Sequence, residues 1–181
     1  IDAFDLYRQV LLDDPTHRGT TEALERMADD EALRFDVVDL LEATYQHNEA
    51  WAKLVQLYQI RLRTAQAPHE RADLYLQMAD LELERLGRVE HGFEHIGQAL
   101  TADPFNQGAQ ERYEELAGAH GMWPALVAHY EAIVDELDDP IRVMELAMVA
   151  GRATMSELGE PARAFDLYSK VLDIEPTHEE A

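Results

Sequence analysis

The chain has 181 residues and no cysteine, so disulfides, thiolate metal ligands and cysteine catalysis are excluded. Its formal net charge is −22, and a field of this sign repels phosphate backbones, which makes nucleic acid a poor partner. The same field favours basic partners and speeds their encounter, unless the acidic surface only keeps the chain soluble.

Targeting and catalytic motifs are missing from the sequence. No apolar run reaches the roughly 18 residues that cross a bilayer, and the first residues lack the basic start and apolar core of a signal peptide. We therefore expect no membrane insertion and a cytoplasmic location. Because no glycine-rich phosphate loop, nucleophile elbow or Ser–His–acid arrangement is visible, we expect no cofactor and no catalysis.

The first predicted element is an amphipathic helix over residues 2–12, which places its apolar residues on one face. Asp13, Asp14 and Pro15 end it, since proline disfavours helix in the residue before it. The opening segment 3–17 closely copies segment 164–178. The later copy is the second helix of a predicted hairpin, so we interpret residues 1–17 as half a repeat of a longer array.

Helical spacing of apolar residues predicts three further helices, at residues 21–28, 33–47 and 51–62. Pro15 and Pro104 are 89 residues apart, whereas Pro104 and Pro176 are 72 apart. We interpret the extra 17 residues as an inserted short helix within residues 18–36.

A long hairpin follows, with its first helix over residues 68–86 and its second over residues 89–100. Pro68 opens the first helix because a first-turn amide has no helical partner. Gly87 ends it, as glycine does at a left-handed C-terminal position. The scheme then repeats, with predicted helices at residues 109–120, 123–137, 140–158 and 161–172. Strand signals are absent, so the fold is predicted to be all-α.

The strongest pattern is a self-match at an offset of 72 residues. It needs no insertion or deletion, and it pairs residues of the same type along its whole length: Trp51 with Trp123, Leu54 with Leu126, Tyr58 with Tyr130, Pro68 with Pro140, Leu74 with Leu146, Leu86 with Leu158, Phe93 with Phe165 and Leu100 with Leu172. Such fidelity is typical of stacked supersecondary units. We therefore predict one domain over residues 1–181, in which residues 37–104 and 109–176 are two double repeats and residues 177–181 begin the next repeat.

The small and large residues of these hairpins resemble those of tetratricopeptide (TPR) repeats, which are helix–turn–helix units of about 34 residues. In one hairpin Ala79 would face Gly92, and in the other Gly151 would face Ala164, with large residues filling around each pair. The resemblance implies a right-handed α–α superhelix, a solenoid of antiparallel hairpins.

In this family the first helices of successive hairpins line a concave groove that binds peptides or protein segments. Carried over by position, the resemblance implies a groove lined by Leu74, Gln77, Met78, Leu81, Glu84, Arg85, Glu111, Glu115, Leu146, Val149, Ala150 and Ala153. Several of these residues are apolar, which favours a helix or an extended apolar segment as ligand. The alternative is that Leu74, Leu81 and Leu146 belong to the core, since periodicity cannot separate groove from core.

Some members of the family hold a peptide's terminal carboxylate with lysine, arginine and asparagine at groove positions. The corresponding positions here carry none of these residue types, so that clamp is absent; they carry Leu74, Gln77, Leu81, Leu146, Val149 and Ala153. Glutamates add negative charge instead, which suits a basic and apolar partner.

One motif points to metal chemistry instead. His91, Glu94 and His95 fit the H-x-x-E-H pattern of inverted zinc peptidases, with both histidines on one helical face. The neighbouring Gly92 and Phe93 are needed for repeat packing, which makes the three side chains an ordinary solvent face. We therefore keep a zinc-dependent hydrolase as a distant alternative and include no metal in the predicted site.

The leading prediction is a non-catalytic scaffold that binds a peptide or protein segment. A structural alternative is that the segment is a spacer or an oligomerisation element of a larger protein, with self-association through its open ends. The first predicts an exposed apolar stripe on the groove side, whereas the second predicts apolar surface at the terminal helices.

Overall fold

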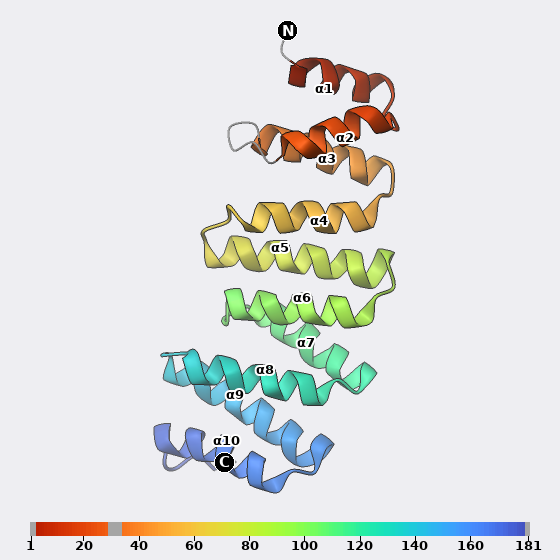
Figure 1. Ribbon diagram of the computed structural model, residues 1–181. Coiled ribbons are helices and arrows are strands. Elements are labelled where there is room, and N and C mark those ends of the chain that lie inside the picture. The colour runs from red at the N-terminus through yellow and green to blue at the C-terminus, as the bar shows by residue number, and fades with distance from the viewer. Residues whose placement is uncertain (1–2, 29–33, 180–181) are drawn as a thin grey trace. The chain divides into compact units, whose positions relative to one another are not determined.

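The computed structural model describes residues 3–28 and 34–179, and these residues form helices and turns without any strand (Figure 1). The α-helices of this part of the chain are α1 (Ala3–Asp13), α2 (Arg18–Met27), α3 (Arg34–His47), α4 (Trp51–Leu62), α5 (Pro68–Asp80), α6 (Val89–Ala102), α7 (Gln107–His120), α8 (Trp123–Glu136), α9 (Pro140–Ala153) and α10 (Pro161–Ile174). The predicted all-α class is confirmed, and each predicted helix overlaps an observed one. The predictions for residues 1–2, 29–33 and 180–181 lie outside the described residues.

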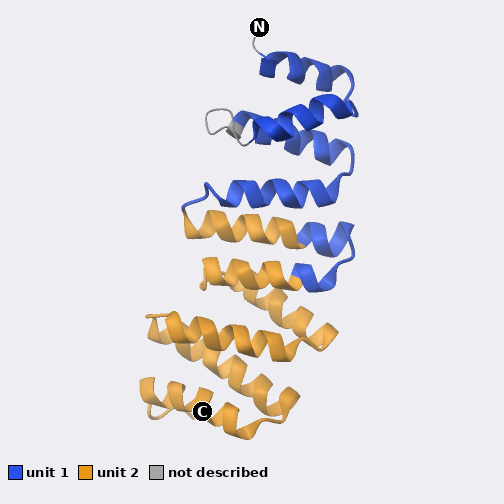
Figure 2. Ribbon diagram, in the orientation of Figure 1, with its two compact units in different colours: residues 1–66, 80–92 blue, residues 67–79, 93–181 orange. Residues whose placement is uncertain are grey.

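The chain divides into two compact units (Figure 2). Unit 1 comprises residues 1–66 and 80–92, and unit 2 comprises residues 67–79 and 93–181. Both helices of the central hairpin are therefore divided between the two units.

In unit 1, each helix packs against the next along the chain. Helix α1 contacts α2 and α3, α2 contacts α3, and α3 contacts α4. The core between them consists of aliphatic side chains at helical spacing, among which Leu24, Leu41 and Leu54 are fully buried. Burying a leucine side chain stabilises a fold by about 1.5–3 kcal/mol, so these residues hold the helices together.

Unit 2 follows the same rule, with α7 packed on α8, α8 on α9 and α9 on α10. Its core includes Ile96, Leu126, Tyr130, Leu146 and Leu167, all almost completely buried. Helices α9 and α10 run antiparallel as one hairpin (Figure 1).

The ends of the helices are set by side chains that the sequence places there. The Asp139 carboxylate accepts a hydrogen bond from the Arg142 amide at 2.8 Å, which confirms its predicted role as the N-cap of α9. The Asn106 side chain caps α7 in the same way, at 2.9 Å from the Ala109 amide. At the other end, Gly87 and Gly159 adopt φ of 64° and 67°, the left-handed conformation that the sequence predicted for a glycine turn.

Two long helices were predicted to be continuous, but both change character in their last turn. Leu81–Arg85 after α5 and Thr154–Leu158 after α9 are π-helical. The residues at equivalent places inside them, Glu82 and Thr154, are buried and polar. Thr154 donates its hydroxyl hydrogen to the carbonyl of Ala150 at 2.7 Å, which satisfies it within its own helix.

Glycines allow close approach inside both hairpins. A Cβ atom added to Gly151 would lie 2.7 Å from Cε1 of Tyr168, and one added to Gly92 would lie 2.5 Å from Cγ of Leu83. The three atoms nearest to the Cβ added at Gly151 all belong to the Tyr168 ring. A large side chain therefore fills the space that each glycine leaves, which keeps the packing dense.

A tyrosine–glutamate hydrogen bond recurs in both units at the 72-residue offset. The Tyr58 hydroxyl donates to Glu42 at 2.9 Å, and the Tyr130 hydroxyl donates to Glu114 at 3.1 Å. Burial raises the pKa of Tyr58 to about 12 and also raises the pKa of Tyr130. Both hydroxyls therefore stay protonated and keep donating at neutral pH, so the two hairpins share one polar contact as well as one apolar pattern.

Candidate protein-binding groove

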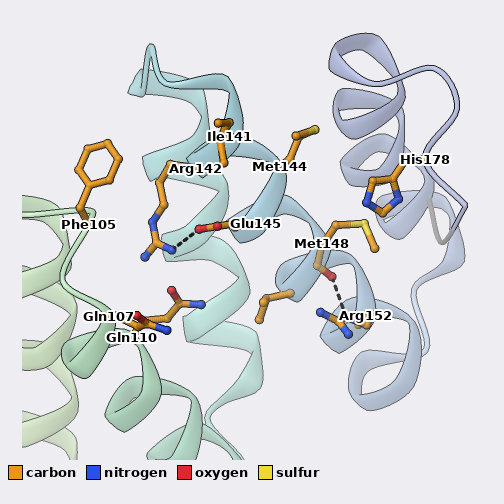
Figure 3. A pocket seen from close by; sticks show the side chains of 11 residues that line it. Phe105, Gln107, Gln110, Ile141, Arg142, Met144, Glu145, Met148, Arg152 and His178 are labelled. Carbon is orange, nitrogen blue, oxygen red and sulfur yellow. Dashed lines mark hydrogen bonds and ion pairs between the residues drawn. The ribbon is translucent and has the colours of Figure 1, made fainter.

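A concave site lies in unit 2, between α7 and α9. This cleft has a volume of about 550 Å³ and is open to solvent on one side. Figure 3 shows its side chains converging from α7, α9 and the turn after α10. We call it the α7–α9 cleft; it is lined by Phe105, Gln107, Gln110, Ile141, Arg142, Met144, Glu145, Met148, Val149, Arg152 and His178.

The apolar part of the cleft comes mostly from one stripe on α9. Ile141, Met144 and Met148 recur at three- and four-residue spacing, which places them on one face of the helix. Ile141 and, across the cleft, Phe105 are largely exposed, whereas Met148 is buried at the base. Methionine side chains are flexible and polarisable, so they can adapt to apolar ligands of different shapes.

Arg142 fixes the start of α9 against the turn that precedes α7. Its Nε donates to the carbonyl oxygen of Pro104 at 2.6 Å, and its Nη1 donates to a carboxylate oxygen of Glu145 at 2.7 Å (Figure 3). The side chain is more than nine-tenths buried, and its Nη2 makes no hydrogen bond. Leaving one donor of a buried guanidinium without an acceptor costs free energy, which the bonds of Nε and Nη1 offset.

The charge balance of the cleft differs from that of the whole chain. Arg152 lies on its rim, with a weak bond from its Nε to the Met148 carbonyl at 3.4 Å. His178 lines the same space, and the one carboxylate, Glu145, is already paired with Arg142. A cleft lined by two arginines and one carboxylate thus lies in a chain whose formal net charge is −22.

The structure separates the predicted groove residues into three groups. Leu74, Met78, Leu146, Ala150 and Ala153 are buried in the core. Gln77, Glu84, Arg85, Glu111 and Glu115 are exposed, and Leu81 is half-buried. Val149 lines the α7–α9 cleft. The alternative of a core role therefore describes Leu74 and Leu146, whose side chains do not face solvent.

Other lining residues were missed by the sequence analysis. The predicted groove positions were transferred from the TPR repeat pattern, and they fall on the face of α9 that contains Leu146. The cleft is lined instead by the adjacent face of α9, which contains Ile141 and Met144. The signal was present, because a second apolar stripe is visible in the sequence of residues 140–153. It was hidden by the fact that α9 is apolar on two sides.

The metal motif is not assembled into a site. Among the residues that the structure describes, no three His, Asp or Glu side chains are gathered so that they could hold a metal ion. His91 and Glu94 are exposed, and the His95 ring lies against Tyr75 with centroids 6.3 Å apart. These contacts fit the interpretation of this helix face as an ordinary surface.

The fold and cleft define an all-α protein built from consecutive helical hairpins with an open, partly apolar cleft. None of its helices, within residues 3–28 and 34–179, is long and apolar enough to span a membrane. No protein-family model and no curated protein sequence matches the chain.

Solved structures of helical-repeat proteins are similar to this chain. One is YrrB, described as a TPR protein with an unusual peptide-binding site; it shares 13% sequence identity, with a TM-score of 0.41 over 98% of this chain and 87% of that chain. Another is MamA, at 13% identity and a TM-score of 0.41 over 97% of this chain and 96% of that chain. Scores of this size carry no argument about a site.

Proposed function

We propose that this chain is a non-catalytic interaction scaffold that holds a segment of a protein partner in the α7–α9 cleft. The observation that carries the proposal is an open cleft with an adaptable apolar floor, built from two helices that start successive hairpins. Ligand sites in proteins usually combine an apolar lining with a few convergent polar groups, as this cleft does.

The lining indicates what the bound segment contains. Met144, Met148 and Ile141 favour a large apolar side chain as the anchor, because burying one such side chain contributes about 1.5–3 kcal/mol. Arg152 at the rim would donate to a backbone carbonyl or another acceptor next to the anchor. Outside the cleft the acidic surface would favour basic residues in the partner and would speed its approach at low salt.

The test uses short displayed peptides selected for binding to the full chain. We expect the selected peptides to share a large apolar residue and to lose affinity for an Ile141→Glu variant by at least about 30-fold, which corresponds to about 2 kcal/mol at an anchor contact. Ile141 is exposed, so this change should leave the fold intact.

The matched control is Ile174→Glu, which places the same charge on an exposed isoleucine outside the cleft. Isothermal titration of both variants with the same peptide separates a cleft effect from a general effect of charge. Equal losses for the two variants, or no loss for Ile141→Glu, would contradict the proposal.

A further inference from the structure

Helices α1 and α10 are two copies of one sequence in different surroundings. Residues 3–17 and 164–178 are identical at 10 of 15 positions. Phe4, Leu6, Val10 and Leu11 of the first copy correspond to Phe165, Leu167, Val171 and Leu172 of the second. At these four positions the two helices carry the same apolar residues, so a difference in their burial reflects a difference in the neighbouring helices.

Helix α1 is covered on the face that contains Leu11. It packs against α2 and α3, and Leu11 is only 4% exposed. Its other face is open: Leu6 is 50% exposed and Val10 is 37% exposed. The α2–α3 surface thus fits the Phe4–Leu11 face of this sequence.

Helix α10 shows the reverse pattern. It packs against α9, and Leu167 and Val171, the counterparts of Leu6 and Val10, are 2% and 0% exposed. On its other face Phe165 is 69% exposed, and Leu172 is half-buried. Its open face is therefore the one that α1 buries against α2 and α3.

The chain thus contains both an open apolar face and a surface that fits the same face of a nearly identical helix. We propose that α10 of one copy docks on the α2–α3 surface of a second copy, in the position that α1 occupies within its own chain. The contact joins two different surfaces, so further copies can add by the same contact.

Helix α1 is then a built-in competitor for this surface. Its attachment is light, because Leu6, Val10 and Leu12 are exposed and Leu11 is its one fully buried residue among those described. Tethering gives it an effective concentration on the order of millimolar, so the intact chain is a monomer at micromolar concentration. Anything that releases α1 should open the surface to α10 of another copy.

Charge gives a second signature of a self-contact. Two copies, each with a formal net charge of −22, repel one another at low salt, so screening should strengthen the association. A basic helix from another protein on the α10 face would show the opposite dependence. The direction of the salt effect therefore distinguishes the two occupants.

The test is sedimentation velocity of the chain of residues 1–181 carrying Leu11→Glu, since a buried charge at this position should detach α1. We expect concentration-dependent oligomers that grow with added salt. The double variant Leu11→Glu/Phe165→Glu should return to the monomer. Leu11→Glu/Phe105→Glu, which changes an exposed phenylalanine in the turn before α7, should stay oligomeric.

Two further measurements keep the test decisive. Phe4→Ser removes a half-buried ring of α1 without burying a charge and should give the same oligomers more weakly. A synthetic peptide of residues 3–17 should dissociate the oligomers, whereas the same peptide carrying Leu11→Glu should not. Circular dichroism checks that each variant keeps its helical content.

The proposal is overturned if folded Leu11→Glu and Phe4→Ser chains remain monomeric. It is also overturned if the oligomers survive Phe165→Glu, resist the peptide of residues 3–17, or weaken as salt is added.

Discussion

Helices α6 and α10 hold the same place in the repeat, 72 residues apart, yet one is buried on two faces and the other on one. Phe93 of α6 is 3% exposed and stacks on Tyr113 of α7, with ring centroids 4.1 Å apart. Its counterpart Phe165 is 69% exposed. The repeat decides which faces are apolar, and the neighbouring helix decides whether an apolar face is covered.

The residues around the two phenylalanines follow the same difference. Gly97 of α6 leaves room for α7 and α8, because an added Cβ would lie 3.1 Å from the Tyr113 hydroxyl and 3.3 Å from the His129 ring. The corresponding residue of α10 is Ser169, whose hydroxyl donates to the Phe165 carbonyl at 2.8 Å within its own helix. A covered face needs a glycine there, whereas an open face accepts a side chain.

The largest expected effect is the difference in the free energy of unfolding between variants of the two phenylalanines. Phe93→Ala should lower the free energy of unfolding by about 3–5 kcal/mol, because it leaves a cavity between α6 and α7. Phe165→Ala should change it by less than about 0.5 kcal/mol, as surface substitutions do. Urea unfolding followed by circular dichroism measures both, and similar losses would show that the α10 face is covered in solution.

A smaller effect is expected one turn further along each helix. Gly97→Leu should destabilise the fold by about 1–3 kcal/mol, because the new side chain overpacks against Tyr113 and His129. Ser169→Leu should be close to neutral, and it should not disturb α9. Thermal unfolding of the two variants side by side is the measurement, and an equal cost would contradict the assignment of Gly97 to a covered face.

The smallest effect concerns pH. His129 of α8 lies against α6, with its Nε2 at 2.8 Å from the Thr101 hydroxyl and its Nδ1 buried without a partner. Burial lowers the pKa of His129, so the folded chain binds its proton less well than the unfolded chain does. Stability should therefore be complete above the ordinary histidine pKa of about 6.5 and should fall as the pH drops below it.

The control for this prediction is His129→Gln, which keeps a polar group but cannot titrate. Its stability should depend less steeply on pH between about 7 and 5, where the unfolded histidine gains its proton. Urea midpoints measured at several pH values give the comparison. Parallel curves for the two chains would contradict a buried neutral His129.

Much of the fold could be predicted from the sequence. Helix positions, the Asp139 cap and the left-handed Gly87 follow from apolar spacing and from local backbone preferences, which act within a few residues. The π-helical last turns were not predicted. A π-helix spaces its backbone hydrogen bonds five residues apart and an α-helix four, so the two leave nearly the same pattern of apolar residues in the sequence.

The candidate site could be predicted only in part. Val149, one of the predicted groove residues, lines the α7–α9 cleft, whereas Leu146 is buried in the core. Arg142 and Phe105 also line the cleft but were not among the predicted residues. Helix α9 is apolar on two faces, and periodicity gives both faces the same weight. Which face lines a cleft depends on where α7 lies, and this helix is separated from α9 in the sequence by the whole of α8.

The sequence by itself determined that this chain is helical and where its hairpins turn, because these features depend on contacts within one or two helical turns. It also showed that the units repeat, because the repeat is a pattern of the sequence itself. Only the tertiary structure decided that Phe93 is covered while Phe165 is open, and that the cleft forms beside α9. Burial depends on which helix comes to lie against a face, and the same residue type at equivalent positions of two repeats can meet different neighbours.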